Sequence, residues 1–409
     1  MTTDEPLISI ARAESFIRDS LSAMPSIRVP LAQAAGRILR EPVIAERQQP
    51  PFDRVMMDGI AIDSAGVAAG VRSFTITGTQ AAGQAPLVLA DNSACIEIMT
   101  GAVLPTACDA VVPVERISIS NGSAVLEEGL SVSAGQHIHP RGSDYPRAKL
   151  LLEPGVLIRA PEVAVIASAG LAEVCVSPRF SAGIISPGDE LVQPGQPIEA
   201  HQIRRSNDQA VAAALESRSD LSAHCYPVVD DPDKVAAQIK TVLEEDDLLV
   251  LCGAVSKGKF DFVPTVLAEC GVKKIFHRIA QRPGKPFWFG IAANGKPVFA
   301  LPGNPVSVLA CAARYLLPAL ELLRGADNSP PYQLPLAKAV DFPPALGWLL
   351  AVQLASSENG ELTAIPQPTN TSGDFAGLSG SDGIVELPAD QQHFPAGYRA
   401  HFYPWGGST

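Results

Sequence analysis

Aromatic and charged residues are scarce in this chain of 409 residues. Only 6% of the residues are aromatic and 18% are charged, whereas 46% are hydrophobic. The formal net charge is −12, and the sequence has no long run of lysine and arginine. Both features argue against nucleic acid as a partner. A chain of this charge that binds an anion must gather its positive charge locally.

Patterns typical of metal sites, disulfides and membrane spans are also absent. The seven cysteines never occur as CxxC, and the seven histidines show no HExxH spacing. We therefore expect reduced, buried cysteines and no structural zinc site. The acidic N-terminal segment shows no signal peptide, and no apolar stretch reaches the ~18–20 residues that a membrane span needs. These absences predict a cytoplasmic protein outside the membrane.

A chain of this length is too long for one hydrophobic core, so two to four domains are expected. Residues 8–24 have the apolar spacing of a helix, and residues 45–140 have the short alternating runs of a β-rich domain. The predicted divisions are 1–45 with 140–178 as a helical and mixed domain, 46–139 as a β-rich inserted domain, 179–327 as an α/β domain, and 328–409 as a small C-terminal β domain.

Strands and helices alternate four times between residues 180 and 325. This order predicts a parallel α/β sheet with helices on both faces. Asp231 and Pro232 have the residue types of a helix N-cap and first turn. The expected strands are 181–186, 223–229, 248–252 and 298–301, and the expected helices are 207–218, one from 232, and one from 305 to about 323.

Each predicted strand leads into or lies near a polar loop that is rich in glycine or proline. Ligands of open α/β sheets bind beyond the carboxyl ends of the strands, and glycines let backbone N–H groups approach an anion. One such loop says little, because these turns end strands in most α/β proteins, but four in one domain indicate a binding site. The loops are SPGDEL (186–191), GAVSKGKFDF (253–262), RPGKP (282–286) and LPGNPVS (301–307).

These loops resemble motifs of the MoeA-type molybdopterin molybdotransferases, and LPGNPVS matches its motif without change. Other similar segments follow in the family's order, from about residue 30 to the C-terminal domain. They are PFDRVMMDG (51–59, family PxFDNSAMDG), IMTGAVLP (98–105, IMTGAxLP), RGSD (141–144, RGEDI), PGDEL (187–191, TGDEL), CGAVSKGKFDF (252–262, GGVSxGxxDF), RPGKPFWFG (282–290, KPGKPxxFG) and SGD (372–374).

The resemblance implies an elongated subunit of four domains that forms a homodimer, with the first domain as the dimerisation domain. It also implies a reaction in which adenylylated molybdopterin and molybdate are substrates, AMP is released and molybdate joins the dithiolene, with Mg²⁺ assisting. The α/β domain would be the molybdopterin-binding domain. Apo-molybdoenzymes or other proteins of cofactor biosynthesis would be the protein partners.

Cleavage of a pyrophosphate-type bond needs carboxylates that hold and orient Mg²⁺. For each matched carboxylate the alternative is a solvated turn or a cap, and that alternative is strongest for Asp230, beside the helix cap Asp231. The catalytic residues that the resemblance predicts are Asp58, Asp144, Glu190, Asp261, Arg278 and Arg282. The predicted metal ligands are Asp230, Asp261 and Glu190.

The most basic stretch runs from His277 to Lys285, with Lys257 and Lys259 in the preceding loop, and supplies the local positive charge. For Lys257 and Lys259 a solvated surface is the better interpretation. The predicted oxyanion-binding residues are Arg282, Lys285, Pro286, Ser307 and Ser372. The predicted pterin- and nucleotide-binding residues are Thr100, Gly101, Gly188, Asp189, Gly253, Ser256, Gly258, Pro302 and Asn304.

Three departures from the family pattern exchange charged groups. Arg278 and Arg282 stand where the family has lysines, so the charge remains but a planar fork replaces a point charge. The family's DSN loop is Arg205-Ser206-Asn207 here, so a base replaces an acid beside the nucleotide and cation region.

Two further departures remove hydrogen-bonding groups. Arg54 and Val55 replace an asparagine and a serine near Asp58, and residues 342–348 lack the arginine that the family has early in its last domain. A second hypothesis is therefore a paralogue that binds molybdopterin as a carrier or scaffold without inserting the metal. A third is a nucleotide pyrophosphatase that shares only the α/β domain, but the motifs of the other domains argue against it.

Overall fold

The structure is a computed structural model that describes residues 6–253, 262–327, 330–357 and 359–406. The chain forms two units, which are treated separately below. Unit 1 comprises residues up to 41, 154–163 and 173–409, and unit 2 comprises 42–153 and 164–172. The chain crosses between them inside helix α3 (Ala160–Ser168) as well as in the two loops near 41 and 153.

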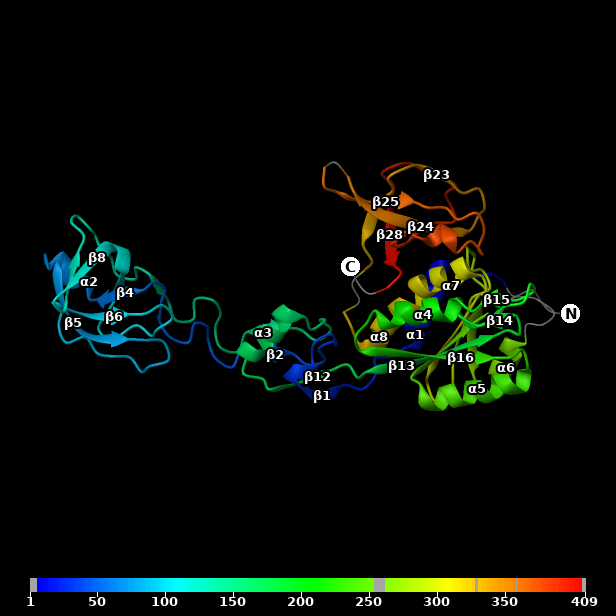
Figure 1. The fold of residues 1–409 in the computed structure, drawn as a ribbon, viewed down its shortest axis with the longest axis horizontal. Helices are drawn as coiled ribbons and strands as arrows, with labels where there is room; N and C mark the ends of the chain where they lie inside the picture. Colours follow the sequence, from blue (N-terminus) through cyan, green and yellow to red (C-terminus); the bar gives the residue numbers. More distant parts are fainter. Residues whose placement is uncertain (1–5, 254–261, 328–329, 358, 407–409) are drawn as a thin grey trace. The chain divides into compact units, whose positions relative to one another are not determined.

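Unit 2 is the β-rich domain that the sequence predicts. Its six-stranded sheet has the order β7-β4-β6-β5-β9-β8 and is antiparallel except for the β5–β6 pair (Figure 1). Alternate residues such as Ile60, Ile62 and Phe74 are fully buried on one side of the sheet. The elements are β4 (Gly59–Ile62), α2 (Ser64–Ala68), β5 (Ser73–Gln80), β6 (Ala94–Ile98), β7 (Ala110–Pro113), η2 (Val114–Arg116), β8 (Ile117–Ser120) and β9 (Ser123–Leu126).

Two short strand pairs complete unit 2. β2 (Val43–Ile44) pairs with β11 (Leu150–Leu152), and β3 (Arg54–Val55) pairs with β10 (Ile138–His139). Both pairs join segments that are about a hundred residues apart in the sequence. They bring the segments on either side of the inserted sheet together.

Unit 1 contains the expected parallel α/β sheet, in the order β16-β13-β17-β21-β20-β18. The first four strands are parallel, whereas β20 and β18 extend the sheet as an antiparallel edge that the sequence did not predict. The strands are β13 (Phe180–Pro187), β16 (Leu221–Val228), β17 (Leu248–Cys252), β18 (Lys273–His277), β20 (Trp288–Ile291) and β21 (Pro297–Leu301); β14 (Leu191–Val192) and β15 (Ile203–Arg204) form a separate pair.

Helices cover both faces of this sheet, as expected for a sheet buried on two sides. Strand β17 is buried at all five positions: Leu249 and Leu251 pack on the face of α5 and α6, and Val250 packs on the face of α4 and α7 (Figure 1). Asp231 caps α5 by accepting from the backbone N–H groups of residues 233 and 234, which confirms the predicted cap. The helices are α4 (Asn207–Glu216), α5 (Pro232–Glu245), α6 (Val263–Glu269) and α7 (Pro305–Cys311).

The N-terminal helix α1 (Ile10–Ser20) packs on the α/β core, not in the first domain where the sequence interpretation placed it. Ile10, Ala13 and Ile17 are buried in the same core as Phe276 and Phe287. The chain before α1 is hydrogen-bonded along residues 278–280, from Ile8 N–H to Arg278 O and from Ala280 N–H to Ile8 O. The buried residues of α1 are therefore covered by their own chain.

A single long helix runs from Pro305 to Arg324 as α7, the π-helical turn η3 (Ala312–Leu316) and α8 (Leu317–Arg324). By length and composition it is apolar enough to cross a membrane, so the expectation that no stretch reaches that length was wrong. However, 78% of its most apolar window is buried inside the protein. The helix is a core element, which explains its apolar composition.

The C-terminal part of unit 1 is a second β-sheet in the order β19-β24-β26-β28-β22, with β25 beside β24. β19 (Gln281–Arg282) belongs to the RPGKP loop and pairs in parallel with Gly347 and Trp348. The remaining elements of unit 1 are β1 (Ile27–Pro30), η1 (Leu31–Gln33), β12 (Glu173–Val176), β22 (Gln333–Pro335), β23 (Val340–Asp341), β24 (Gly347–Ser356), β25 (Leu362–Pro366), η4 (Ala376–Leu378), β26 (Gly383–Leu387), β27 (His393–Phe394) and β28 (Arg399–Pro404).

Candidate functional site

The loops at the carboxyl ends of the parallel strands lie next to one another, as the sequence predicts. Strands β17 and β21 are neighbours, and Gly253 N–H donates to Leu301 O where both strands end. A Cβ added to Gly303 would lie 3.5 Å from the Cα of Gly253, so the two loops approach closely. The side-chain amide of Asn207 donates to Gly303 O at 2.7 Å and joins α4 to the same edge.

Most of the residues predicted for pterin, nucleotide and metal binding in unit 1 lie at or beside this edge. Asp189, after β13, accepts a hydrogen bond from Asp230 N–H, after β16, so two of the carboxylate-bearing loops touch. Gly188, Glu190, Gly253, Pro302 and Asn304 follow the ends of the neighbouring strands. Ser256, Gly258 and Asp261, with Lys257 and Lys259, lie outside the described residues.

Arg205 is not a free base in the site. Its guanidinium lies 2.7 Å from the carboxylate of Asp208, and the two side chains are only 7% and 0% exposed. A buried charge needs a partner, and each of these groups supplies one for the other. The positive charge that Arg205 brings in place of the family's acid is thus paired with Asp208 inside the fold.

Sequence reasoning also missed Asn207, whose Oδ1 is one of several buried side-chain atoms without a hydrogen-bond partner among the described residues. The side-chain amide nitrogen of Asn207 is held by Gly303. A buried acceptor without a partner is costly, and this one, beside the strand-end loops, can accept a hydrogen bond from a ligand. Asn207 is the third residue of the Arg205-Ser206-Asn207 segment, in which the sequence analysis considered only the change at Arg205.

A cavity of about 280 Å³ lies beside Arg282, within unit 1. Arg282 is the cross-strand partner of Trp348, and the Trp348 ring stacks on Phe342 with centroids 4.6 Å apart. The polar part of the wall consists of Thr369, Thr371 and Ser372, together with Asp341. The cavity therefore combines a cation, a carboxylate and hydroxyl groups with an aromatic wall.

The predicted oxyanion-binding residues do not all reach this cavity. Arg282 and Ser372 line it, and Ser372 accepts from the Asn304 amide at 2.7 Å and from Val306 N–H at the start of α7. Ser307 is buried in α7, and Lys285 is exposed. Arg278, at φ +73°, Lys285 and Pro286 belong to a hairpin held by backbone hydrogen bonds from residues 278 and 279 to Phe287 O and Lys285 O.

A buried network braces the loop that carries Arg282. The Tyr315 hydroxyl donates to Oε1 of Gln281, and the Gln281 amide donates to Gly284 O. Burial raises the pKa of Tyr315 well above its usual value, so its hydroxyl remains a donor. A Cβ at Gly284 would collide with Sγ of Cys311, which explains why glycine stands there.

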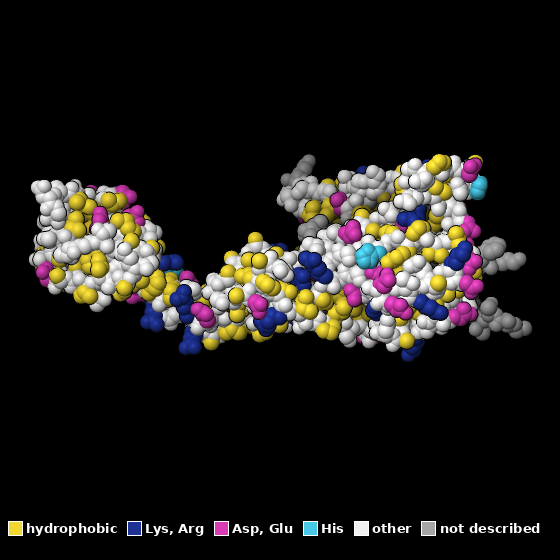
Figure 2. All heavy atoms as spheres, turned by 60° about the horizontal axis from the view of Figure 1, so that its bottom comes forward, with side chains coloured by type: hydrophobic (Ala, Val, Ile, Leu, Met, Phe, Trp, Pro, Cys, Tyr) yellow, Lys and Arg dark blue, Asp and Glu magenta, His cyan; other side chains and the backbone are white. Residues whose placement is uncertain are grey.

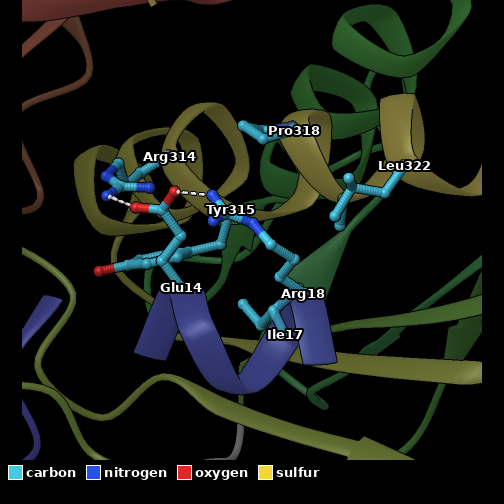
Figure 3. Close-up of a pocket in the computed structure, with 8 residues that line it drawn as sticks. Glu14, Ile17, Arg18, Arg314, Tyr315, Pro318 and Leu322 are labelled. Atoms are coloured by element: carbon cyan, nitrogen blue, oxygen red, sulfur yellow. Dashed lines mark hydrogen bonds and ion pairs between the residues drawn. The ribbon is translucent and has the colours of Figure 1, made fainter. Parts of the chain in front are cut away.

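The preceding residue of the same helical turn, Arg314, is fixed by two carboxylates. It is 4% exposed and binds Glu14 of α1 at 2.6 Å and Glu386 of β26 at 2.5 Å. Figure 3 shows Glu14 beside both Arg314 and the exposed Arg18, at a small cavity between α1 and the long helix. Such a buried, paired arginine ties α1, the π-helical turn and the C-terminal sheet together.

Unit 2 brings three of the sequence motifs together. Val55 N–H donates to Ala102 O, Gly101 N–H donates to Val55 O, and Met56 N–H donates to His137 O. These bonds join PFDRVMMDG to IMTGAVLP and to the segment that leads into RGSD. The four predicted residues of this unit, Asp58, Thr100, Gly101 and Asp144, therefore lie on segments that contact one another.

The carboxylate of Asp58 is held by Thr100. Both the backbone N–H and the hydroxyl of Thr100 donate to Oδ1 at 2.6 Å. These hydrogen bonds, the hydroxyl's first, lower the pKa of Asp58 below its usual value. The group is exposed and anionic, as a carboxylate that meets a cation must be.

Among the described residues, no group of three or more histidine, cysteine, aspartate or glutamate side chains is arranged to hold a metal ion. On the face that Figure 2 shows, acidic side chains are scattered over both units with basic ones among them. The charge of −12 therefore forms no single acidic patch on that face.

Comparisons with known proteins cover nearly the whole chain. Residues 8–170 match "MoeA N-terminal region (domain I and II)", residues 183–322 match "Probable molybdopterin binding domain" and residues 333–405 match "MoeA C-terminal region (domain IV)". A molybdopterin molybdenumtransferase of Synechocystis sp. is 36% identical over 98% of this chain and 100% of its own length. Another from Synechococcus elongatus is 33% identical over 96% of this chain and 98% of its length.

A solved structure shares the fold. The molybdopterin biosynthesis MoeA protein from Pyrococcus horikosii aligns with a TM-score of 0.80 and 26% identity. The alignment covers 98% of this chain and 100% of that protein. The resemblance drawn from the sequence motifs is confirmed.

Proposed function

Since the chain belongs to the MoeA family of molybdenum cofactor biosynthesis, we propose that it is a molybdopterin molybdotransferase that inserts molybdate into adenylylated molybdopterin and releases AMP. The observation that carries the proposal is the meeting of the strand-end loops at one sheet edge, with the Arg282 cavity in the same unit. The loops offer backbone N–H groups to an anionic nucleotide, and the cavity offers a cation and hydroxyls to an oxyanion.

The described residues fit Mg²⁺ as a helper. Asp189, Glu190 and Asp230 offer only oxygen ligands, and Mg²⁺ prefers oxygen, keeps several waters and is bound through one or two carboxylates together with substrate phosphates. When bound, Mg²⁺ would neutralise phosphate charge as AMP leaves; Glu190, Asp230 and Asp261 are the proposed ligands.

The remaining roles belong to side chains of this chain. Arg282 and the hydroxyl of Ser372 would orient the oxyanion, and the Asn207 Oδ1 would accept a donor of the substrate. Asp58 and Asp144 of unit 2 would act as carboxylates in the same reaction, each held by a neighbouring side chain. We propose a cytoplasmic homodimer that passes its product to molybdoenzymes or other proteins of cofactor biosynthesis.

The test is release of AMP from adenylylated molybdopterin by the purified protein, with and without molybdate and Mg²⁺. Molybdate-dependent AMP release, and an active molybdoenzyme when the product is added to its apo form, are the expected results. Complementation of a bacterial strain that lacks its own molybdotransferase is the matching test in cells. If the protein shows neither molybdate-dependent AMP release nor complementation, the proposed transferase activity is refuted.

A second candidate function is a molybdopterin-binding carrier or scaffold. The observation that favours it is the apolar wall of the cavity, where Phe342, Trp348 and Leu350 stand and residues 342–348 contain no arginine. A carrier would bind the adenylylated pterin but release no AMP when molybdate is added. The same assay therefore separates the two functions.

A further inference from the structure

Two hydrogen bonds connect Arg54, His139 and Asp144 in unit 2. The Arg54 guanidinium lies 2.9 Å from Nδ1 of His139, and Nε2 of His139 lies 2.9 Å from Oδ1 of Asp144. A guanidinium can only donate, so Nδ1 must accept and the ring proton must sit on Nε2. The imidazole then donates that proton to the Asp144 carboxylate.

The backbone around these side chains is tied on both sides. Arg54 and His139 are cross-strand partners in the β3–β10 pair. Asp144 N–H donates to Gln49 O, and Gly142 N–H donates to Pro50 O. The described hydrogen bond of the Asp144 carboxylate uses Oδ1 alone, which leaves Oδ2 for a ligand.

Neither general-base catalysis by His139 nor a contribution to folding stability explains the Arg54–His139–Asp144 contacts. Both ring nitrogens of His139 are engaged, so the ring has no lone pair left to take a proton from a substrate. The His139 and Asp144 side chains are 27% and 47% exposed, and contacts of that kind add little to stability. What the line does supply is a fixed tautomer and a fixed orientation of the carboxylate.

We infer that Arg54 and His139 are positioning residues that hold the Asp144 carboxylate in one orientation for the proposed reaction. The inference rests on the proposed function through the role of Asp144. It also assigns a role to Arg54, which replaces an asparagine of the family pattern, because Arg54 is hydrogen-bonded to His139. Neither residue was singled out as functional by the sequence motifs.

The first test reads the tautomer directly. In protein with ¹⁵N-labelled histidine, the His139 ring should show a protonated Nε2 and an unprotonated Nδ1 near neutral pH. Asp144→Asn or Arg54→Leu should change those signals, because each removes one partner. A proton on Nδ1, or signals that neither variant changes, would overturn the inference without any use of enzyme activity.

The second test reads the reaction. His139→Leu should slow AMP release about tenfold with little change in the KM for the pterin, and His139→Gln, which keeps one donor and one acceptor, should restore part of the rate. In an Asp144→Asn background His139→Leu should add no further loss. The matched control is His224→Leu, which removes another histidine–aspartate contact, His224 with Asp246 in unit 1, and should leave the rate of the folded protein unchanged.

The outcomes separate the two proposals. An active wild type whose rate is insensitive to His139→Leu, or whose losses add fully in the double variant, overturns the positioning role alone. A wild type that binds the pterin and releases no AMP overturns the proposed function and this role with it.

Discussion

Replacement of Arg282 tests the oxyanion site most directly. Arg282 is exposed at the wall of the cavity, and its side chain has no hydrogen bond or ion pair with another described residue. Its removal therefore breaks no described internal contact, and a loss of molybdate affinity would report on the ligand. A hydrogen bond to a charged group contributes about 1.5–3 kcal/mol, which corresponds to about ten- to a hundredfold in affinity.

The exposure of Arg282 favours a loss of molybdate affinity at the lower end of that range. An exposed guanidinium is well hydrated before the ligand arrives, so we expect Arg282→Ala to raise the KM for molybdate about tenfold. Arg282→Lys should restore most of the affinity, because it keeps the charge that the family uses at this place. The assay is molybdate-dependent AMP release at saturating adenylylated pterin, and Arg399→Ala, another exposed arginine of unit 1, is the control.

Equal molybdate dependence in the wild type, Arg282→Ala and Arg282→Lys would refute the reasoning and place the oxyanion elsewhere. A loss in Arg282→Lys as large as in Arg282→Ala would show that the planar fork of arginine, not its charge, is required.

Four further predictions follow from the same structure. Asp261→Asn should keep pterin binding but stop AMP release, because an amide is a poorer Mg²⁺ ligand; normal AMP release would make Asp261 structural. Tyr315→Phe should leave Oε1 of Gln281 without a donor and lower the free energy of unfolding by about 1–3 kcal/mol in urea denaturation, with a higher KM for molybdate; unchanged values would refute the brace. Thr100→Val should raise the depressed pKa of Asp58. The rate of AMP release falls as the pH drops through that pKa, so the acid side of the pH–rate profile should move to higher pH. An unchanged profile would show that Asp58 does not set its acid side. Light scattering should find a dimer, and a single 42.9 kDa species at micromolar concentration would contradict the proposed homodimer.

Local patterns predicted the α/β domain well because its elements carry their own signals. Asp231 and Pro232 start α5 by capping chemistry that depends only on the next three residues. Strand β17 is apolar at every position because both faces are covered, and the sequence shows that run directly. The glycine-rich loops then follow the ends of such strands.

Long-range pairing explains what the sequence did not predict. The apolar spacing of α1 predicts that one face of the helix is covered. It does not identify the covering residues, which are Phe276 and its neighbours. Likewise, Gln281 and Arg282 have no strand pattern of their own, and they form β19 only because Gly347 and Trp348 offer an edge. Short strands of this kind take their conformation from tertiary contacts.

The charged departures from the family pattern have different structural meanings. Arg205 and Asp208 are three residues apart around the start of α4, so their ion pair is a local contact. Arg54 and His139 are 85 residues apart, and only the β3–β10 pairing reveals their contact. Arg282 differs from both, because its charge faces a cavity, with no described ion pair. Arg205 and Arg54 are thus each held by a neighbouring side chain, whereas Arg282 remains available to a ligand in the cavity that Trp348 also lines.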